Sequence, residues 1–273
     1  TSATPIGLSL FHTSFNFLNM LLLIGFVKPI EMLTKKVVSM AQTEEDRSLL
    51  RLELLTSDIS TSPEFSMDEV KKEIIKYGQT TQMMIQPITD LLYEQDDDRV
   101  EHLTKRISKM ERSSDHTEEE LVRYLVKVSE RSMSENASLR MRGFLSIIGD
   151  LERIGDIFYQ MAKTLEAKNH DKAWFTPNQR NGIRDMIDLL DIALTEMNQN
   201  LQRTSVDINL SRATEAELKI NKLRDTLKAE HLQSIDKKGT NIRSGFLYVD
   251  LYSSGERMGD VIMGVNETLK SIP

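Results

Sequence analysis

The chain contains no cysteine and few glycine, proline and aromatic residues. The absence of Cys from its 273 residues excludes disulfides and thiolate metal sites. With 12 Gly, 6 Pro and only 6% aromatics, the sequence offers little of the turn chemistry and β-rich composition that sheets require. Charged residues make up 28%, which is typical of long helices. The composition therefore predicts an all-α protein.

The charge and the motifs exclude several classes of function. A net charge of −7 argues against a surface that binds the nucleic-acid backbone, so we expect no nucleic-acid partner. The sequence has no Gly-rich phosphate loop, and its Ser and His residues stand in no order that indicates a nucleophile–base triad. We therefore predict that the protein is not an enzyme.

An uncharged apolar stretch covers residues 6–27. As a helix rising about 1.5 Å per residue, it can cross a hydrocarbon core of about 30 Å. Lys28, Lys35 and Lys36 follow it, and the positive-inside rule then predicts that everything downstream is cytoplasmic. The alternative is an amphipathic or buried helix of a soluble protein.

Two polar residues interrupt this stretch one helical turn apart, His12 and Asn16. Polar side chains at membrane depth face other helices or a pathway rather than lipid. They are candidates for a transport pathway. The alternative is that they only hydrogen-bond to neighbouring helices.

The remaining sequence predicts a polar connector over 39–66 and then six helices. Ser66 with Glu69 indicates a capping box at the start of the first helix, and Pro87 is expected to kink or break it. The apolar periodicity predicts helices over 67–95, 98–129, 135–168, 177–203, 210–237 and 241–271. Short links between long helices favour antiparallel bundles, so we expect two three-helix bundles, 67–170 and 171–273.

A short acidic motif occurs in both predicted bundles. Residues 150–161 read DLERIGDIFYQM, and residues 254–265 read SGERMGDVIMGV. Residues i and i+4 share one helix face, so each copy presents a Glu–Asp pair: Glu152 with Asp156, and Glu256 with Asp260. The repetition of the pair at the same place indicates a duplicated binding arrangement.

The helices before each motif carry further acids at the same spacing. Glu111 and Asp115 are expected to approach Glu152 and Asp156 across the first bundle. Converging carboxylates repel one another unless a cation, a basic side chain or protons compensate. Oxygen-only ligands suit Mg²⁺, Ca²⁺, Mn²⁺ or an oxygen-ligated iron centre, and the candidate ions we consider are Mg²⁺, Mn²⁺, Fe and Zn²⁺.

In the second bundle, Glu217, Asn221 and Asp225 lie at i, i+4 and i+8 opposite Glu256 and Asp260. Asn221 is expected to replace Glu111, which leaves one charge fewer and predicts weaker cation binding.

A simpler interpretation is that all these acids form solvated faces. In that case Arg153 and Arg257 are their salt-bridge partners.

Residues 67–272 resemble PhoU proteins, the paired three-helix-bundle regulators of bacterial phosphate uptake. The resemblance rests on LERIGD at 151–156, GERMGD at 255–260 and MERSSD at 110–115. It implies a regulatory function and metal binding through the repeated Glu/Asp-x-x-x-Asp pattern, from which Asn221 departs. The implied metal ligands are Glu111, Asp115, Glu152, Asp156, Asp225, Glu256 and Asp260.

The N-terminal part resembles the last membrane helix of bacterial Na⁺/phosphate cotransporter family proteins, through the segment His12-Thr-Ser-Phe-Asn16. The resemblance implies that residues 1–38 end a transporter core whose remainder is missing from this chain. The bulk of the chain would then lie on the cytoplasmic side of the bacterial inner membrane. Na⁺ and inorganic phosphate would be substrates of the parent protein, and a homodimer is compatible with this architecture.

Two further classes of function remain open. One is a free-standing PhoU-like adaptor that binds a partner protein without metal. The other is a carboxylate-bridged metal oxidase, which the absence of a Glu-x-x-His pattern disfavours.

Overall fold

The computed structural model describes residues 11–17, 19, 62–235 and 241–273, which fall into two compact units, Thr1–Arg51 and Leu52–Pro273. Throughout these described ranges the regular structure is helical and no strand occurs. The prediction of an all-α protein is therefore confirmed.

In the first unit, only a short helical stretch at 11–17 and residue 19 are described. The rings of Phe11 and Phe15 stack with their centroids 6.2 Å apart. Most of the predicted membrane segment 6–27 lies outside the described residues, so that segment stays a prediction. No helix in the described part of the chain is both long and apolar enough to cross a bilayer.

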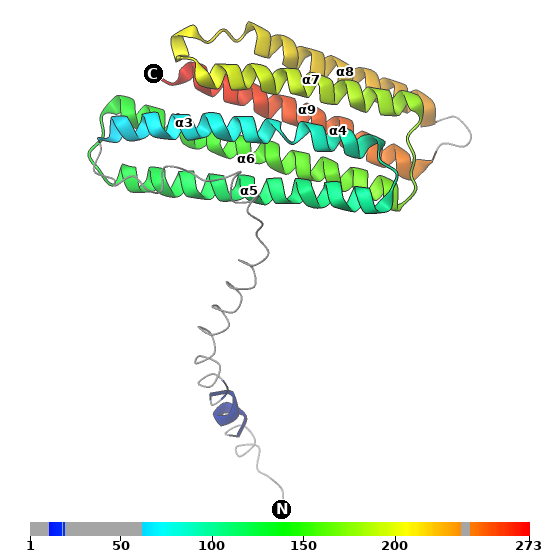
Figure 1. Ribbon diagram of the computed structural model, residues 1–273, viewed down its shortest axis with the longest axis horizontal. Helices are drawn as coiled ribbons and strands as arrows, with labels where there is room; N and C mark the ends of the chain where they lie inside the picture. The colour runs from blue at the N-terminus through cyan, green and yellow to red at the C-terminus, as the bar shows by residue number, and fades with distance from the viewer. Residues whose placement is uncertain (1–10, 18, 20–61, 236–240) are drawn as a thin grey trace, which may run out of the picture. The chain divides into compact units, whose positions relative to one another are not determined.

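The second unit is built from long helices (Figure 1). They are α3 (Pro63–Gln82), α4 (Ile85–Tyr93), α5 (Asp97–Ser129), α6 (Glu135–His170), α7 (Pro177–Gln202), α8 (Ser211–Ile235) and α9 (Ile242–Ser271). A single 3₁₀ turn, η2 (Ser205–Asp207), lies between α7 and α8. These bounds agree closely with the predicted helices, except at the first one. The predicted end of the fifth helix, near Gly239, lies outside the described residues.

Most helices begin where a side chain caps the free backbone amides of the first turn. Ser134 accepts a hydrogen bond from the amide of Ala137 at the start of α6. Thr176 and Gln179 form a reciprocal capping box at the start of α7, which Pro177 also favours. Such caps explain why the sequence predicts these boundaries well.

The first predicted helix, 67–95, is wrong at its start. It begins at Pro63 because Ser62 is the N-cap and proline is favoured in the first turn; Ser66 is buried inside the helix. The predicted connector 39–66 therefore ends in helix. The helix is also interrupted between Gln82 and Ile85, as expected from Pro87, whose ring conflicts with the carbonyl four residues earlier.

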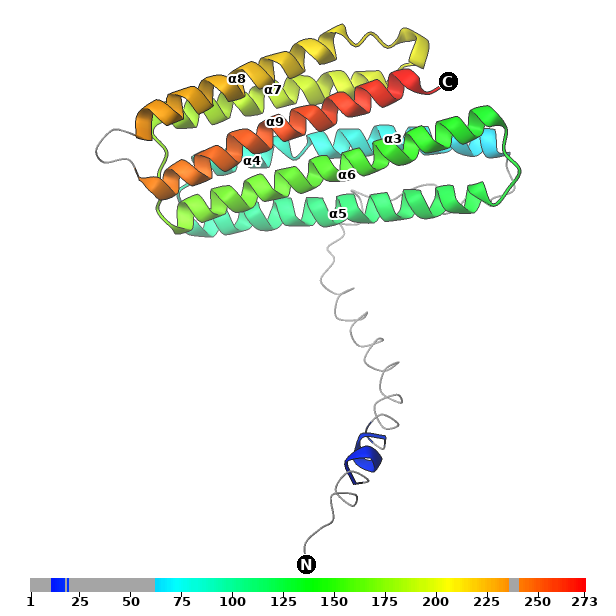
Figure 2. The same ribbon diagram turned by 180° about the vertical axis from the view of Figure 1, so that it is seen from behind.

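Within the second unit, α5 packs against α6, and α8 against both α7 and α9. The two predicted bundles, 67–170 and 171–273, also pack on each other, because α6 lies beside α9 and α3 beside α7 (Figures 1 and 2). Buried side chains from all seven long helices form one continuous apolar core.

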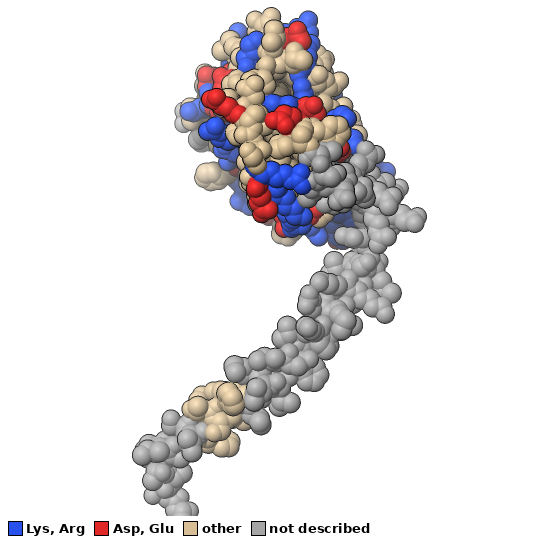
Figure 3. Space-filling view, turned by 90° about the vertical axis from the view of Figure 1, so that its left-hand side faces the viewer, with Lys and Arg blue, Asp and Glu red and all other residues tan. Residues whose placement is uncertain are grey.

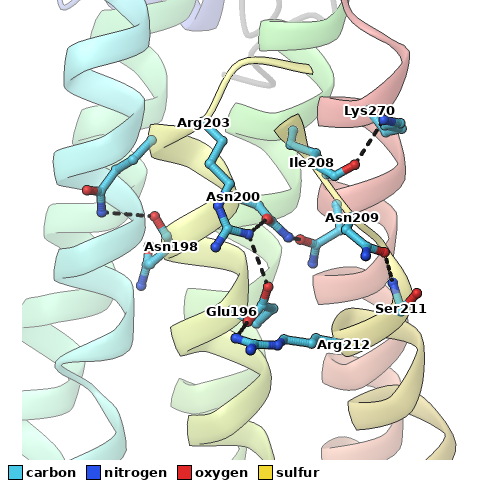
Figure 4. A network of polar contacts seen from close by, with 11 residues as sticks. Glu196, Asn198, Asn200, Arg203, Ile208, Asn209, Ser211, Arg212 and Lys270 are labelled. Carbon is cyan, nitrogen blue, oxygen red and sulfur yellow. Dashed lines mark hydrogen bonds and ion pairs between the residues drawn. The ribbon is translucent and has the colours of Figure 1, made fainter. Parts of the chain in front are cut away.

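A buried polar network joins the end of α7 to α9 (Figure 4). The amide of Asn200 donates to Oδ1 of Asn266 at 2.7 Å, and both residues are fully buried. Arg203 donates to Oδ1 of Asn200 at 2.7 Å and forms an ion pair with the buried Glu196. Lys270 at the end of α9 donates to the carbonyl of Ile208 at 2.9 Å. The bond between Asn200 and Asn266 fixes the register of α7 against α9, because a shift would leave a fully buried amide without its partner.

The end of the second unit that holds the start of α3 carries basic and acidic side chains close together (Figure 3). The view shows no extended patch of one sign on this face.

Candidate metal centre

The closest approach of α5 to the acidic motif of α6 is made by a glycine. A Cβ added at Gly155 would lie only 2.9 Å from Oγ of Ser114, so no larger residue fits without a shift. This contact of Ser114 with Gly155, which we call the α5–α6 crossing, brings the acidic positions of α5 beside those of α6. The glycine of the motif thus has a packing function that the acidic pattern alone does not reveal.

Three of the predicted ligands come together at this crossing. One carboxylate oxygen each from Glu111, Asp115 and Asp156 lie within 4.8 Å of one another. Glu111 and Asp156 are partly buried, whereas Asp115 is exposed. Among the described residues, this is the one group of three or more acids, His or Cys that could hold a metal ion.

The carboxylates of the crossing repel one another more than nearby basic side chains compensate: Arg112 lowers the pKa of Glu111, but the pKa stays raised. Burial raises the pKa of Glu111 above its ordinary value, and the nearby Asp115 and Asp156 raise it further. Burial followed by the charge of Asp156 likewise raises the pKa of Asp115. Glu111 and Asp115 therefore bind protons more readily than isolated carboxyls do, and a cation would relieve the same repulsion.

Glu152 lies at the edge of this trio and not within it. Its pKa is raised to about 7, first by burial and then by Asp156, Glu118 and Asp115. Glu118, which the sequence analysis did not single out, thus belongs to the same acidic cluster. Its signal in the sequence is its position, one further turn along the face that carries Glu111 and Asp115.

Tyr77 of α3 holds Ser114 of α5 in place at the crossing. The buried Tyr77 hydroxyl donates to the Ser114 carbonyl at 3.0 Å and lies 2.7 Å from Ser114 Oγ. Burial raises the pKa of Tyr77, so it remains a neutral donor. Ser114 is therefore fixed between Tyr77 and Gly155, which positions the acids on either side of it.

The donor set at this crossing consists only of carboxylate oxygens. Hard cations such as Mg²⁺ and Mn²⁺, and oxygen-ligated iron, accept such ligands. Zn²⁺ fits less well, because it prefers His and Cys ligands and the trio contains neither. The residues present thus fit the metal class predicted from the sequence.

The second acidic motif is arranged differently. The Arg224 guanidinium forms ion pairs with Glu256 and with Asp225, both at 2.8 Å. The Asp225 side chain is 69% exposed, and Asp260 is also exposed. The structure therefore does not bring Asp225, Glu256 and Asp260 together as it does the first three acids.

The register of α8 also differs from the one expected from spacing. Gly259, the equivalent of Gly155, faces Ile220, whose Cδ1 would lie 3.1 Å from an added Cβ. Ile220 therefore takes the place of Ser114. It follows that Glu217 corresponds to Glu111, and that Asn221 corresponds to Asp115 and not to Glu111 as predicted.

The two motif arginines have other neighbours than the predicted pairs. Arg257 donates to Oγ of Ser254 at 2.9 Å. Burial raises the pKa of Asp150, and the positive charge of Arg153 opposes this rise. The ion pair that compensates Glu256 comes from Arg224, which the sequence analysis did not identify.

In the N-terminal unit, the predicted pathway residues contact each other. The Asn16 amide nitrogen lies 3.1 Å from Nε2 of His12, and both side chains are exposed. This is the i,i+4 contact expected on one helix face. A role for them in transport stays a prediction.

Comparisons with known proteins agree with this arrangement. Residues 74–165 match the family model of the PhoU domain. No curated protein sequence matches the chain significantly. Among solved structures, the chain is similar to the crystal structure of PhoU from Pseudomonas aeruginosa, with a TM-score of 0.66 and 14% identity, covering 76% of this chain and 96% of that one.

It is also similar to the crystal structure of the phosphate transport system regulatory protein PhoU from Streptococcus pneumoniae. That match has a TM-score of 0.63 and 16% identity, and it covers 76% of this chain and 95% of that one. The resemblance to the Na⁺/phosphate cotransporter family stays a prediction. Residues 74–165 therefore match the PhoU domain, and the chain has the fold of PhoU proteins over the 76% of its length that these structures cover.

Proposed function

We propose that this chain regulates phosphate transport and that its first bundle responds to a cation held by Glu111, Asp115 and Asp156. The observation that carries the proposal is the fold, which matches two PhoU chains over 96% and 95% of their lengths. One of these is described as a regulatory protein of a phosphate transport system. The carboxylates at the α5–α6 crossing support the cation-dependent part.

The mechanism follows from how the acids are held. A bound cation supplies the positive charge that the carboxylates lack. With that charge present, α5 and α6 can stay close at Ser114 and Gly155; without it, repulsion favours protonation or separation of the acids. Ser114 is bonded to Tyr77 of α3, and α3 packs on α7, so a change at the crossing is connected to the second bundle.

Regulation requires a partner that distinguishes the two states, because an effector shifts an equilibrium only through its differential affinity. We propose that the partner is a phosphate transporter. In the first form of this proposal, residues 1–38 end the core of a Na⁺-dependent phosphate transporter in the bacterial inner membrane. The domain then lies on the cytoplasmic side and acts on its own transporter.

The second form is a free-standing regulator that binds a separate transporter. The extent of the match supports it, since 76% of this chain covers almost the whole length of both PhoU chains. Membrane partitioning of residues 1–40 distinguishes the two forms: the attached domain requires that this segment enters vesicles.

The experiment that tests the proposed function is uptake of radiolabelled phosphate by bacterial cells that lack their own PhoU and express this chain. We expect the wild type to change the uptake rate and the Asp115→Asn/Asp156→Asn variant to lose that effect. Asp260→Asn, at the matching position of the second motif, is the control and should behave as the wild type. An uptake rate that is the same with and without the wild-type chain contradicts the second form of the proposal; the first form is contradicted if joining the chain to its own transporter also leaves the uptake rate unchanged.

A further inference from the structure

The two bundles can be compared position by position, because each motif glycine contacts one residue of the neighbouring helix. Gly155 faces Ser114, and Gly259 faces Ile220. Aligning these contacts pairs Glu111 with Glu217, Asp115 with Asn221 and Glu118 with Arg224.

The electrostatic neighbours support this alignment independently. Asp156 raises the pKa of Glu111, and Asp260 raises that of Glu217 in the same way. Glu118 acts on Glu152, and at the equivalent place Arg224 lies 2.8 Å from Glu256. The two bundles therefore share one arrangement of side chains. The position of the negative Glu118 in the first bundle is taken by the positive Arg224 in the second.

The consequence for the local charge is large. The first crossing gathers five carboxylates: Glu111, Asp115, Glu118, Glu152 and Asp156. The second has four carboxylates, one amide and one guanidinium: Glu217, Asp225, Glu256, Asp260, Asn221 and Arg224. Between aligned positions, Asp115 in place of Asn221 adds one negative charge to the first crossing, and Glu118 in place of Arg224 makes a difference of two more.

Arg224 is well placed to act as a permanent cation. Its side chain is 29% exposed, and that of Glu256 is 22% exposed, so the pair is screened less than an ordinary surface ion pair. Nε of Arg224 also lies 2.8 Å from the exposed Asp225 but makes no hydrogen bond with it, so Glu256 is the hydrogen-bonded partner of the guanidinium. Arginine keeps its charge at any physiological pH, so this cation cannot dissociate.

We propose that Arg224 is the built-in counterion of the second acidic motif and takes the place of an exchangeable cation there. The domain then has one crossing that responds to a dissolved cation, in the first bundle, and one that is held closed by its own side chain. This inference rests on the proposed cation site of the first bundle. It confines the response to a dissolved cation to that bundle.

The direct test transfers the charges of the first crossing to the second. The double substitution Asn221→Asp/Arg224→Glu restores the acids of Asp115 and Glu118 at their equivalent positions. Equilibrium dialysis against Mn²⁺, followed by metal analysis, should find a single ion bound per wild-type chain and a second ion per double-variant chain. A folded double variant that binds no more Mn²⁺ than the wild type overturns the inference and leaves the proposed function standing.

The reverse substitution, Glu118→Arg, places a positive charge at the first crossing and leaves the second crossing unchanged. It should abolish Mn²⁺ binding and raise the melting temperature of the metal-free protein by about 1–4 °C, because an attraction to Glu152 replaces a repulsion. If the double variant does not fold, retention of Mn²⁺ binding by Glu118→Arg overturns the inference, and its loss supports it.

A wild type that binds no Mn²⁺ would instead contradict the cation site of the proposed function. The melting temperatures of the metal-free proteins then test whether Arg224 acts as a counterion. A rise in Glu118→Arg together with a fall in the neutral variant Arg224→Gln supports the counterion; unchanged values in both overturn it.

Discussion

The backbone of Gly155 lies against the side chain of Ser114, so close that an added Cβ would be 2.9 Å from Ser114 Oγ. Ser114 cannot easily move away, because Tyr77 holds its hydroxyl at 2.7 Å from the opposite side. The spacing of α5 and α6, and with it the distance between their acids, depends on this contact.

Gly155→Ala should therefore weaken both the fold and the acidic site. Overpacking of a tight contact typically costs about 1–3 kcal/mol, and we expect a loss of that size in the free energy of unfolding in urea. The separation of α5 from α6 should also weaken Mn²⁺ binding, which a calorimetric titration measures.

Gly149→Ala on the same helix is the matched control for this substitution. Nothing lies within 4 Å of the position of its Cβ. The better helix propensity of alanine should then raise stability by about 0.5–1 kcal/mol. Equal effects of the two substitutions would contradict the role given to the contact of Gly155 with Ser114.

The metal-free protein should lose stability as the pH rises from about 4.5 to about 7. The folded state raises the Glu152 pKa from 4.5 to about 7, mainly through burial and then through Asp156, so it binds this proton more tightly than the unfolded state does. Where the folded state holds more protons, stability falls with increasing pH. Glu152→Gln should flatten this part of a pH series of unfolding curves, whereas the exposed Glu130→Gln should not. A wild-type slope in Glu152→Gln would argue against crowded acids at the crossing.

Lys168 should give the opposite trend at alkaline pH. Its ammonium is buried, donates to the Leu92 carbonyl at 3.0 Å and lies 5.7 Å from the Trp174 ring centroid. Burial, with a smaller effect of Arg180, lowers its pKa from 10.5 to about 8, so the folded state releases this proton first. The contribution of Lys168 to stability should then increase between about pH 8 and pH 10.5.

Unfolding measurements on Lys168→Met across this range check the prediction. The difference in stability between the wild type and this variant should grow in favour of the wild type as the pH rises. The exposed Lys127→Met serves as the control and should show a constant difference. A constant difference for Lys168→Met as well would mean that burial does not lower the pKa of Lys168.

The buried pair Asn200 and Asn266 should contribute strongly to stability. Asn200→Ala leaves Oδ1 of Asn266 and one donor of Arg203 without their partner, and an unsatisfied buried polar group costs about 1–3 kcal/mol. Chemical denaturation should show a loss of this size or more. Gln199→Ala, at the adjacent exposed position, should change stability little; similar losses for both would contradict a specific role of the network.

Much of the fold could be predicted from the sequence, because local signals mark the helix ends. Thr176 and Pro177 begin α7 where predicted, and Pro87 interrupts the first helix as expected. The start of α3 was misplaced because Ser62 and Ser66 both precede suitable residues, and only the packing of Ser66 in the core decides between them.

The candidate site was predicted in part. The i,i+4 spacing identifies the acids of each helix, but it does not fix the register of one helix against another. Acids or amides at 217, 221 and 225 permit two alignments, and the contact of Gly259 with Ile220 selects one. Arg224 was missed for the same reason, since its neighbour Glu256 lies on a different helix.

The most direct test of this account is a calorimetric titration with Mn²⁺ of the wild type, Asp156→Asn and Asp260→Asn. These substitutions make the same change at equivalent positions of the two motifs. We predict that Asp156→Asn weakens binding by about 10–100-fold or abolishes it, as expected for loss of a metal-site carboxylate, while Asp260→Asn binds as the wild type does. Equal affinities in all three proteins, or loss of binding in Asp260→Asn alone, would contradict a cation site at the α5–α6 crossing.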